Sequence, residues 1–160
     1  LLTLPYFEMT GPPGFVSDAA GAIVGLTTGT TRGEILKSIL ECETLYFAES
    51  VRSLAEMGID TSRFVATGGG AKSDAWLQIK ADVFGVPFVR NQVTEAGVLG
   101  AAMLAGMATG VLADASEAAE RFVREERTFE PHRNRHRAYG EKLENYRDLL
   151  PTLRDLLRRL

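Results

Sequence analysis

Residues 63–83 read RFVATGGGAKSDAWLQIKADV, and the expected fold depends on this stretch. The apolar run at its start predicts a short strand, and Ser73-Asp74 can cap a helix that continues to about Val83. Gly68, Gly69 and Gly70 lie between the two elements. Because glycines carry no side chain, a ligand can lie directly against their backbone, and the following helix offers unpaired N–H groups.

Strands and helices alternate on both sides of this unit, which is typical of an α/β domain. Hydrophobic periodicity and turn residues predict strands over 1–7, 21–26 and 85–89, and helices over 31–58, from residue 94 onward and over 117–124, the last capped by Ser116. After Pro131, an Arg-rich stretch leads into an amphipathic helix. We expect this helix to pack along the outside of the domain, with a kink or break near Pro151.

Composition excludes several classes of protein. A net charge of −3 provides no positive field for nucleic acid or for an anionic membrane, so we expect neither as a partner. The single cysteine, Cys42, cannot form an intramolecular disulfide, which favours a cytoplasmic location and a buried thiol. Residues 96–113 carry no charge but are mostly Ala and Gly, so we expect a helix buried inside the domain rather than a membrane span.

The glycine-rich turn matches neither of two common phosphate-binding motifs. Ser73 stands where the dinucleotide fingerprint needs a third glycine. In the P-loop lysine follows glycine directly, whereas here Ala71 separates Gly70 from Lys72. On spacing alone, a purely structural turn and a nucleotide site are equally open.

Other polar residues have simpler explanations than catalysis. His132 and His136 lie four apart, but the arginines around them would repel a metal ion, so we expect a solvated basic stretch. Trp76 is expected to fill the core rather than to flank a base. Four acidic residues are candidate acids or bases, each with an alternative role as a helix cap or solvated charge: Asp18, Asp74, Asp82 and Glu95. We expect no catalytic or metal-binding residue in this chain.

Three further stretches resemble the FGGY carbohydrate kinases. The hexapeptide GAIVGL at 21–26, followed by Glu34-Ile35 and by SILE at 38–41, resembles the second signature of this family. TGGGAKSDAWLQ at 67–78 with ADV at 81–83 resembles its adenosine-binding segment, and EAG at 95–97 with LGAA at 99–102 resembles its next helix. The resemblance extends from about residue 1 to residue 131.

The resemblance implies an α/β domain with the actin-like, ribonuclease-H-like ATPase fold, which binds ATP between two halves. We therefore divide the chain into a nucleotide-binding domain over 1–131, without its first strands, and a helical extension over 132–160 packed on it. Gly68 and Gly69 correspond to the glycines that approach the nucleotide, Gly70 is their neighbour, and Ser73 corresponds to a polar side chain near the adenine. A planar base needs flat, side-chain-free backbone and a few polar contacts, which agrees with these residues.

The resemblance also implies what this chain lacks. The catalytic aspartate, the phosphate loops, most of the sugar pocket and the main contacts to Mg²⁺ belong to the other, N-terminal part of such kinases. We therefore expect ATP or ADP with Mg²⁺, a small sugar or polyol, and the missing N-terminal domain as partners, and no kinase activity from this chain alone. Residues 8–13, EMTGPP, depart from the Gly-Glu-Arg-Thr-Pro type sequence of xylulose-kinase-like members, so the sugar stays open.

Two other functions share some of these features. An actin-like module that binds ATP to control assembly would keep the fold and the glycine turn, but not the signature over 21–41. A dinucleotide-dependent oxidoreductase would need the glycine fingerprint that is absent here. Apolar faces on the Ala/Gly-rich helix and the final helix could pack within the chain or form a homodimer.

Overall fold

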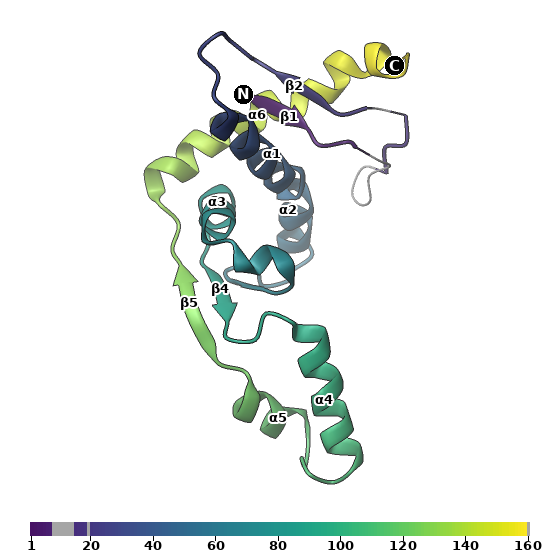
Figure 1. Ribbon diagram of the computed structural model, residues 1–160, viewed down its shortest axis with the longest axis vertical. Coiled ribbons are helices and arrows are strands. Elements are labelled where there is room, and N and C mark those ends of the chain that lie inside the picture. Colours follow the sequence, from purple (N-terminus) through teal and green to yellow (C-terminus); the bar gives the residue numbers. More distant parts are fainter. Residues whose placement is uncertain (8–14, 19, 160) are drawn as a thin grey trace.

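The computed structural model describes residues 1–7, 15–18 and 20–159 as a mixed α/β chain (Figure 1). The loop at 8–13 therefore lies outside the described residues. In chain order the elements are β1 Leu2–Leu4, β2 Ala22–Val24, α1 Arg32–Tyr46, α2 Ala48–Glu56, β3 Phe64–Ala66, the 3₁₀ turn η1 Gly69–Lys72, α3 Asp74–Phe84, β4 Phe88–Asn91, α4 Ala96–Ala108, α5 Ala115–Phe122, β5 Glu125–Phe129 and α6 Arg133–Leu157.

Two small sheets organise these elements. β1 and β2 form an antiparallel pair, and a second sheet has the order β3-β4-β5. β3 and β4 are parallel and are connected through α3, whereas β5 runs antiparallel to β4 with Phe88 opposite Phe129. The parallel βαβ unit confirms the strand, turn and helix predicted over 63–83, and it places the glycine turn at the C-terminal end of β3.

The hydrophobic core has two parts, which meet at α3. One joins β1, α1, α3 and α6 around the fully buried Leu4, Cys42 and Leu45. The other lies between α3 and the three-stranded sheet, around Leu77 and Phe129. Burial of Cys42 is confirmed, and its Sγ accepts a hydrogen bond from the backbone N–H of Thr3 at 3.2 Å.

The predicted helix over 31–58 is two helices. α1 ends at Tyr46 and α2 begins at Ala48, with Phe47 between them. The N–H of Phe47 bonds to the carbonyl of Thr44, three residues back, and the Thr44 hydroxyl donates to the Leu40 carbonyl. A side-chain hydroxyl that bonds to the preceding turn bends a helix, which accounts for the break.

One expectation for the C-terminal third was wrong, and one strand was missed. The cap of α5 is Asp114, whose side chain accepts from the Glu117 N–H, while Ser116 lies inside the helix. β5 was not expected, because its sequence EERTF is mostly charged. α6 continues through Pro151 without a break, and the alternative of a kink there stays a prediction. Its apolar face packs on the core through the buried Tyr146 and Leu149.

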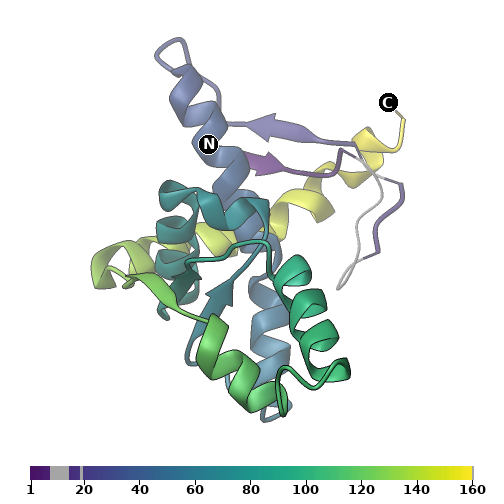
Figure 2. The ribbon, with the colours of Figure 1, turned by 60° about the horizontal axis from the view of Figure 1, so that its bottom comes forward.

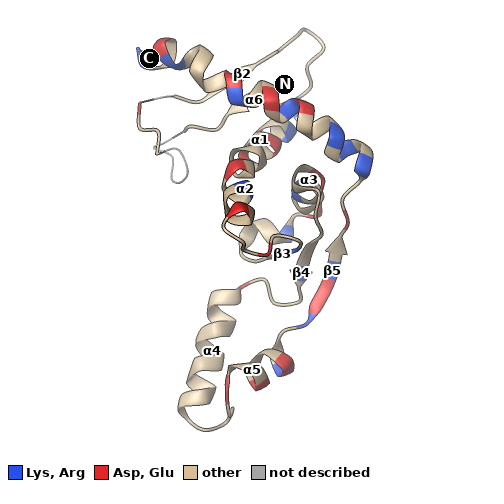
Figure 3. Cartoon of the chain, turned by 180° about the vertical axis from the view of Figure 1, so that it is seen from behind, with Lys and Arg blue, Asp and Glu red and all other residues tan. Residues whose placement is uncertain are grey.

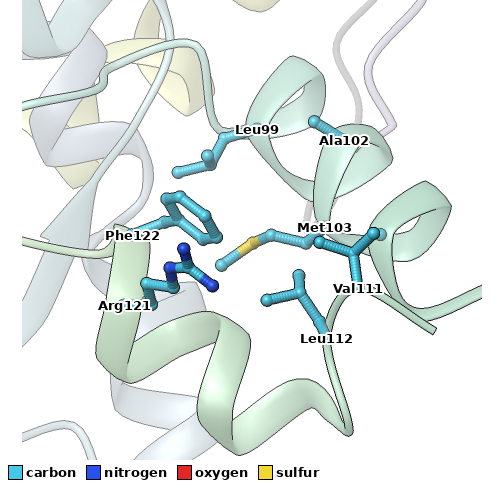
Figure 4. A pocket seen from close by; sticks show the side chains of 8 residues that line it. Leu99, Ala102, Met103, Val111, Leu112, Arg121 and Phe122 are labelled. Carbon is cyan, nitrogen blue, oxygen red and sulfur yellow. The ribbon is translucent and has the colours of Figure 1, made fainter. Parts of the chain in front are cut away.

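The Ala/Gly-rich helix α4 is not buried. None of its residues is buried, and Val98 and Leu104 are 72% and 65% exposed. It lies beside α5 at the end of the molecule remote from β1 and β2, and it carries no charged residue (Figures 1 and 3). Leu99, Met103, Leu112 and Phe122 line a hollow of ≈190 Å³ between the two helices (Figure 4). The described chain supplies no further element to cover the outer face of α4, so the expected burial was wrong. Within the described ranges no helix is long and apolar enough to cross a membrane.

Candidate functional site

The glycine turn connects β3 to α3 by way of η1. Gly68 adopts φ +76° and ψ −168°, a conformation that is essentially restricted to glycine. Its N–H donates to the carbonyl of Thr94 at 2.7 Å, and its carbonyl accepts from the N–H of Ala71 at 3.1 Å. Ala71 is buried in the core beside Leu77. The turn therefore packs on the core through Ala71 and is hydrogen-bonded to the segment that precedes α4.

The outer face of the turn is open. A Cβ atom built on Gly68 or Gly69 would meet no atom within 4 Å, whereas one on Gly70 would approach Cζ3 of Trp76 to 3.0 Å. The first two glycines thus present bare backbone to solvent, and the third allows the indole to pack closely. This arrangement provides flat backbone against which a planar ligand can lie.

Ser73 and Trp76 form the entrance to α3. Ser73 is the N-cap, and its Oγ accepts from the N–H of Trp76 at 3.2 Å, which leaves the hydroxyl proton free for another acceptor. The indole N–H of Trp76 donates to Oγ1 of Thr44 at 3.1 Å, and the ring packs against the core. The expectation that Trp76 belongs to the core is confirmed.

An ion pair closes one side of the turn. Lys72 Nζ lies 2.8 Å from Glu95 Oε1, and this hydrogen bond holds the pKa of the Glu95 carboxyl below its usual range. Thr94, whose carbonyl receives the N–H of Gly68, precedes Glu95 directly. The residues before α4 therefore border the turn through both backbone and side chain, which explains how Glu95 reaches the site.

A charge cluster lies next to the turn at the start of α3, and of its members sequence reasoning had named only Asp74. Arg90 of β4 and Arg127 of β5 both bond to Asp74, at 2.5 Å each, and the Arg90 hydrogen bond is the main cause that lowers the pKa of the Asp74 carboxyl. The signal in the sequence was Arg90, which directly follows the apolar strand predicted at 85–89. A charged side chain on an internal strand needs a partner.

The other two acidic candidates lie elsewhere. Asp18 pairs with Arg154 at 2.9 Å and also with Arg158, which holds its pKa below the ordinary value. Asp82 accepts hydrogen bonds from the backbone and ring of His132, at 2.8 and 3.1 Å. The two histidines are therefore not merely solvated as expected, since Nδ1 of His136 also contacts the Asp82 carbonyl at 3.0 Å. In the ranges that the structure describes, no three His, Cys, Asp or Glu residues are grouped to hold a metal ion.

Comparison with known families identifies the domain. The model of the C-terminal domain of the FGGY family of carbohydrate kinases matches residues 1–109, which include both small-sheet strands β1 and β2, the glycine turn and α4. The chain belongs to this family. The matched segment thus contains the residues described above that border the turn, except Arg127 of β5.

Two curated kinases illustrate the similarity of this FGGY chain to its relatives. The xylulose kinase of Bacillus subtilis is 31% identical over 156 residues, which are 98% of this chain and 31% of that protein. The glycerol kinase of Bordetella parapertussis is 41% identical over 129 residues, which are 80% of this chain and 25% of that protein. The chain thus spans about a third or less of the length of the relatives it matches.

The FGGY fold extends through α6. The solved xylulose kinase of Lactobacillus acidophilus superposes with a TM-score of 0.82 and 27% identity, covering 96% of this chain and 31% of that one. The α/β fold with the actin-like, ribonuclease-H-like ATPase architecture is thereby confirmed.

Proposed function

We propose that this chain is the ATP-binding, C-terminal part of a carbohydrate kinase that phosphorylates a sugar or polyol hydroxyl. The observation that carries the proposal is the open glycine turn, which an FGGY kinase domain presents at the end of a parallel strand. Ligands of open α/β sheets bind outside the carboxyl ends of the strands. Gly68 lies at that end of β3.

The turn suits the adenosine part of ATP or ADP. Gly68 and Gly69 offer backbone without side chains, Gly70 keeps the turn close to Trp76, and the free hydroxyl proton of Ser73 can bond to a ring nitrogen. We therefore assign nucleotide binding to Gly68, Gly69, Gly70 and Ser73.

The reaction itself needs groups beyond this turn. Phosphoryl transfer depends on charge stabilisation around the γ-phosphate by Mg²⁺ and on a base for the substrate hydroxyl. We propose that an N-terminal domain, corresponding to the remaining length of the relatives, supplies the catalytic aspartate, the phosphate loops and most Mg²⁺ contacts. The 160-residue chain alone is then inactive as a kinase, and a sugar-dependent ATPase rate from it would overturn this assignment.

Substrate and organisation follow as broader proposals. The relatives include a xylulose kinase and a glycerol kinase, so the substrate class is a small ketose or polyol. Residues 1–131 are proposed to form the nucleotide-binding domain and residues 132–160 an extension, supported by the contacts of Tyr139 and Lys142 in α6 with Glu41 in α1. A cytoplasmic location suits the single buried thiol of Cys42.

Two glycine substitutions separate fold from binding. Gly68→Ala places a side chain at φ +76° and is expected to lower the free energy of unfolding by about 1–3 kcal/mol. Gly69→Ala meets open space and ordinary backbone, so its stability should stay within roughly 0.5 kcal/mol. Its methyl group, however, projects into the proposed base-binding face, and Mg-ADP affinity should fall about tenfold.

The measurement is a titration of the labelled chain with Mg-ADP, followed by the amide signals of residues 68–76, with NAD as the control ligand. Urea unfolding of each variant gives its stability. Binding by Gly69→Ala equal to that of the unchanged chain would show that the turn is structural only, because the stability of this variant is intact.

A further inference from the structure

Arg90 is a charged residue in an unusually enclosed place. It lies on β4, the central strand of the three-stranded sheet, and its side chain is only 12% exposed. Removing a guanidinium from water is costly unless its donors are paired. The groups that accept hydrogen bonds from the Arg90 guanidinium therefore have to account for its position.

Its donors reach three separate segments. Nη1 bonds to Oδ1 of Asp74 at 2.5 Å, in the first turn of α3, and lies 3.4 Å from the carbonyl of Ala71 in η1. Nε and Nη2 form a two-pronged contact with the carboxylate of Glu126 in β5, at 3.2 and 3.0 Å. One planar group thus joins the residue after the glycines, the helix that follows them, and the far strand of the sheet.

The glycine turn needs such an external support. Glycine has greater backbone freedom than any other residue, and the bare faces of Gly68 and Gly69 make no side-chain contacts that could restrict it. Ala71 lies within η1 and Asp74 begins the helix that follows it, and both contact Arg90. The bidentate geometry with Glu126 fixes the orientation of the guanidinium, which a single point charge could not do.

We infer that Arg90 is a positioning residue of the nucleotide site, which holds the glycine turn in the shape that binds the nucleotide by joining Ala71, Asp74 and Glu126. The inference rests on the proposed function. Arg90 does not touch the open face of the turn, and it acts through the backbone that the nucleotide contacts.

The test compares two arginines that both pair with β5. Arg90→Gln removes the guanidinium that joins the three segments. Arg90→Lys keeps the positive charge but cannot form the bidentate contact with Glu126. Arg63→Gln is the matched control, because Arg63 beside β3 pairs with Glu125 of β5 and its hydrogen bond does not involve the turn. Mg-ADP affinity, thermal stability and amide hydrogen exchange of Ala71 and Ser73 are measured for each chain.

Arg90→Gln should weaken Mg-ADP binding about tenfold and accelerate exchange at the Ala71 and Ser73 amides by a similar factor, corresponding to one lost charged contact. Arg90→Lys should recover part of both effects, and Arg63→Gln should change neither by more than roughly twofold. Because Arg63→Gln also removes an ion pair to β5, it shows what a merely structural loss does.

Two outcomes would overturn the inference. One is unchanged exchange at Ala71 and Ser73 in Arg90→Gln, and the other is ADP affinity equal to that of Arg63→Gln. If the unchanged chain does not bind Mg-ADP, the proposed function fails for this chain, while the exchange rates still decide whether Arg90 holds the turn.

Discussion

Asp82 is a buried carboxylate that joins two helices. It lies on α3 and is 2% exposed. Its oxygens accept from the backbone and ring of His132, from Gln78 at 3.0 Å, and from Arg135 at 3.4 Å. Burial opposes ionisation of this group, but the hydrogen bonds outweigh it and hold its pKa below the ordinary value. Asp82 therefore fixes the start of α6 against α3 as long as it is ionised.

We predict that acid weakens this joint. The folded-state pKa of Asp82 lies below its unfolded value, so its contribution is complete at neutral pH and is lost as the pH falls below about 4, through the folded-state pKa. Asp82→Asn should remove about 2 kcal/mol at pH 7 and flatten the acid limb of the stability curve. Urea unfolding between about pH 2 and about pH 7, the range over which carboxyl groups titrate, measures both effects.

The control for this experiment is Asp155→Asn in the same helix α6, whose carboxyl is exposed. This substitution should leave the free energy of unfolding at pH 7 unchanged. An acid limb of equal steepness in Asp82→Asn and in the unchanged chain would contradict the role given to Asp82.

Sequence reasoning at the residue scale identified one contiguous segment and missed its support. Gly68, Gly69, Gly70 and Ser73 could be named because adjacent residues remain adjacent in the fold, and their role stays a prediction. Arg90 could not be linked to them, since it lies 16 residues from Asp74 and 36 from Glu126 along the chain. Only the pairing of β4 with β5 brings these groups together.

The start of α1 depends on a reciprocal cap. Oγ1 of Thr31 accepts from the N–H of Glu34 at 3.2 Å, and Oε2 of Glu34 accepts from the N–H of Thr31 at 2.8 Å. This capping box pairs two amides that the helix itself cannot pair. It lies within the family signature, so the segment that identified the family also begins its long helix.

We predict that Thr31→Ala lowers the free energy of unfolding by about 1 kcal/mol, the usual cost of a lost N-cap. Thr28→Ala, in the exposed turn just before the helix, is the control and should be neutral within roughly 0.5 kcal/mol. Thermal unfolding of both variants, followed by far-UV circular dichroism, measures the difference. Equal melting temperatures for the two variants would rule out a contribution from the cap.

Element types were predictable where hydrophobic periodicity was strong, and element ends were not. The strand, turn and helix over 63–84 follow from an apolar run, three glycines and a capping serine. The break at Phe47 depends on a hydroxyl bonded within its own helix, which periodicity does not reveal. β5 carries mostly charged residues, and two of them, Glu125 and Glu126, pair with Arg63 and Arg90, so its pattern does not resemble that of a strand.

At the scale of the whole molecule, α4 exposes apolar side chains to solvent. It is free of charge along its length (Figure 3), and the side chains of Val98 and Leu104 point into solvent rather than into the hollow shared with α5. Exposed apolar surface favours association. The expected burial of this helix was wrong because periodicity cannot tell which of its faces the described chain leaves open.

We predict that the chain self-associates through α4. The double variant Val98→Gln with Leu104→Gln should reduce concentration-dependent association, measured by sedimentation velocity, while its melting temperature changes little because both side chains are mostly exposed. Val24→Gln, another exposed apolar residue at the remote end of the molecule, is the control. Association that persists in the double variant would place the contact elsewhere.

The pairing of Asn91 with Glu125 across β4 and β5 has a topological consequence. The chain leaves the sheet at one of these residues and re-enters at the other, so the 33 residues between them, with α4 and α5, form an excursion whose two ends are neighbours. Figures 1 and 2 show both helices at the end of the molecule where the chain leaves β4 and returns to β5. A short hairpin turn could bridge the same gap. Its first residues also hold the glycine turn, through the Thr94 carbonyl and the Glu95 carboxylate, so an exchange of the segment between homologous kinases has to keep both residues.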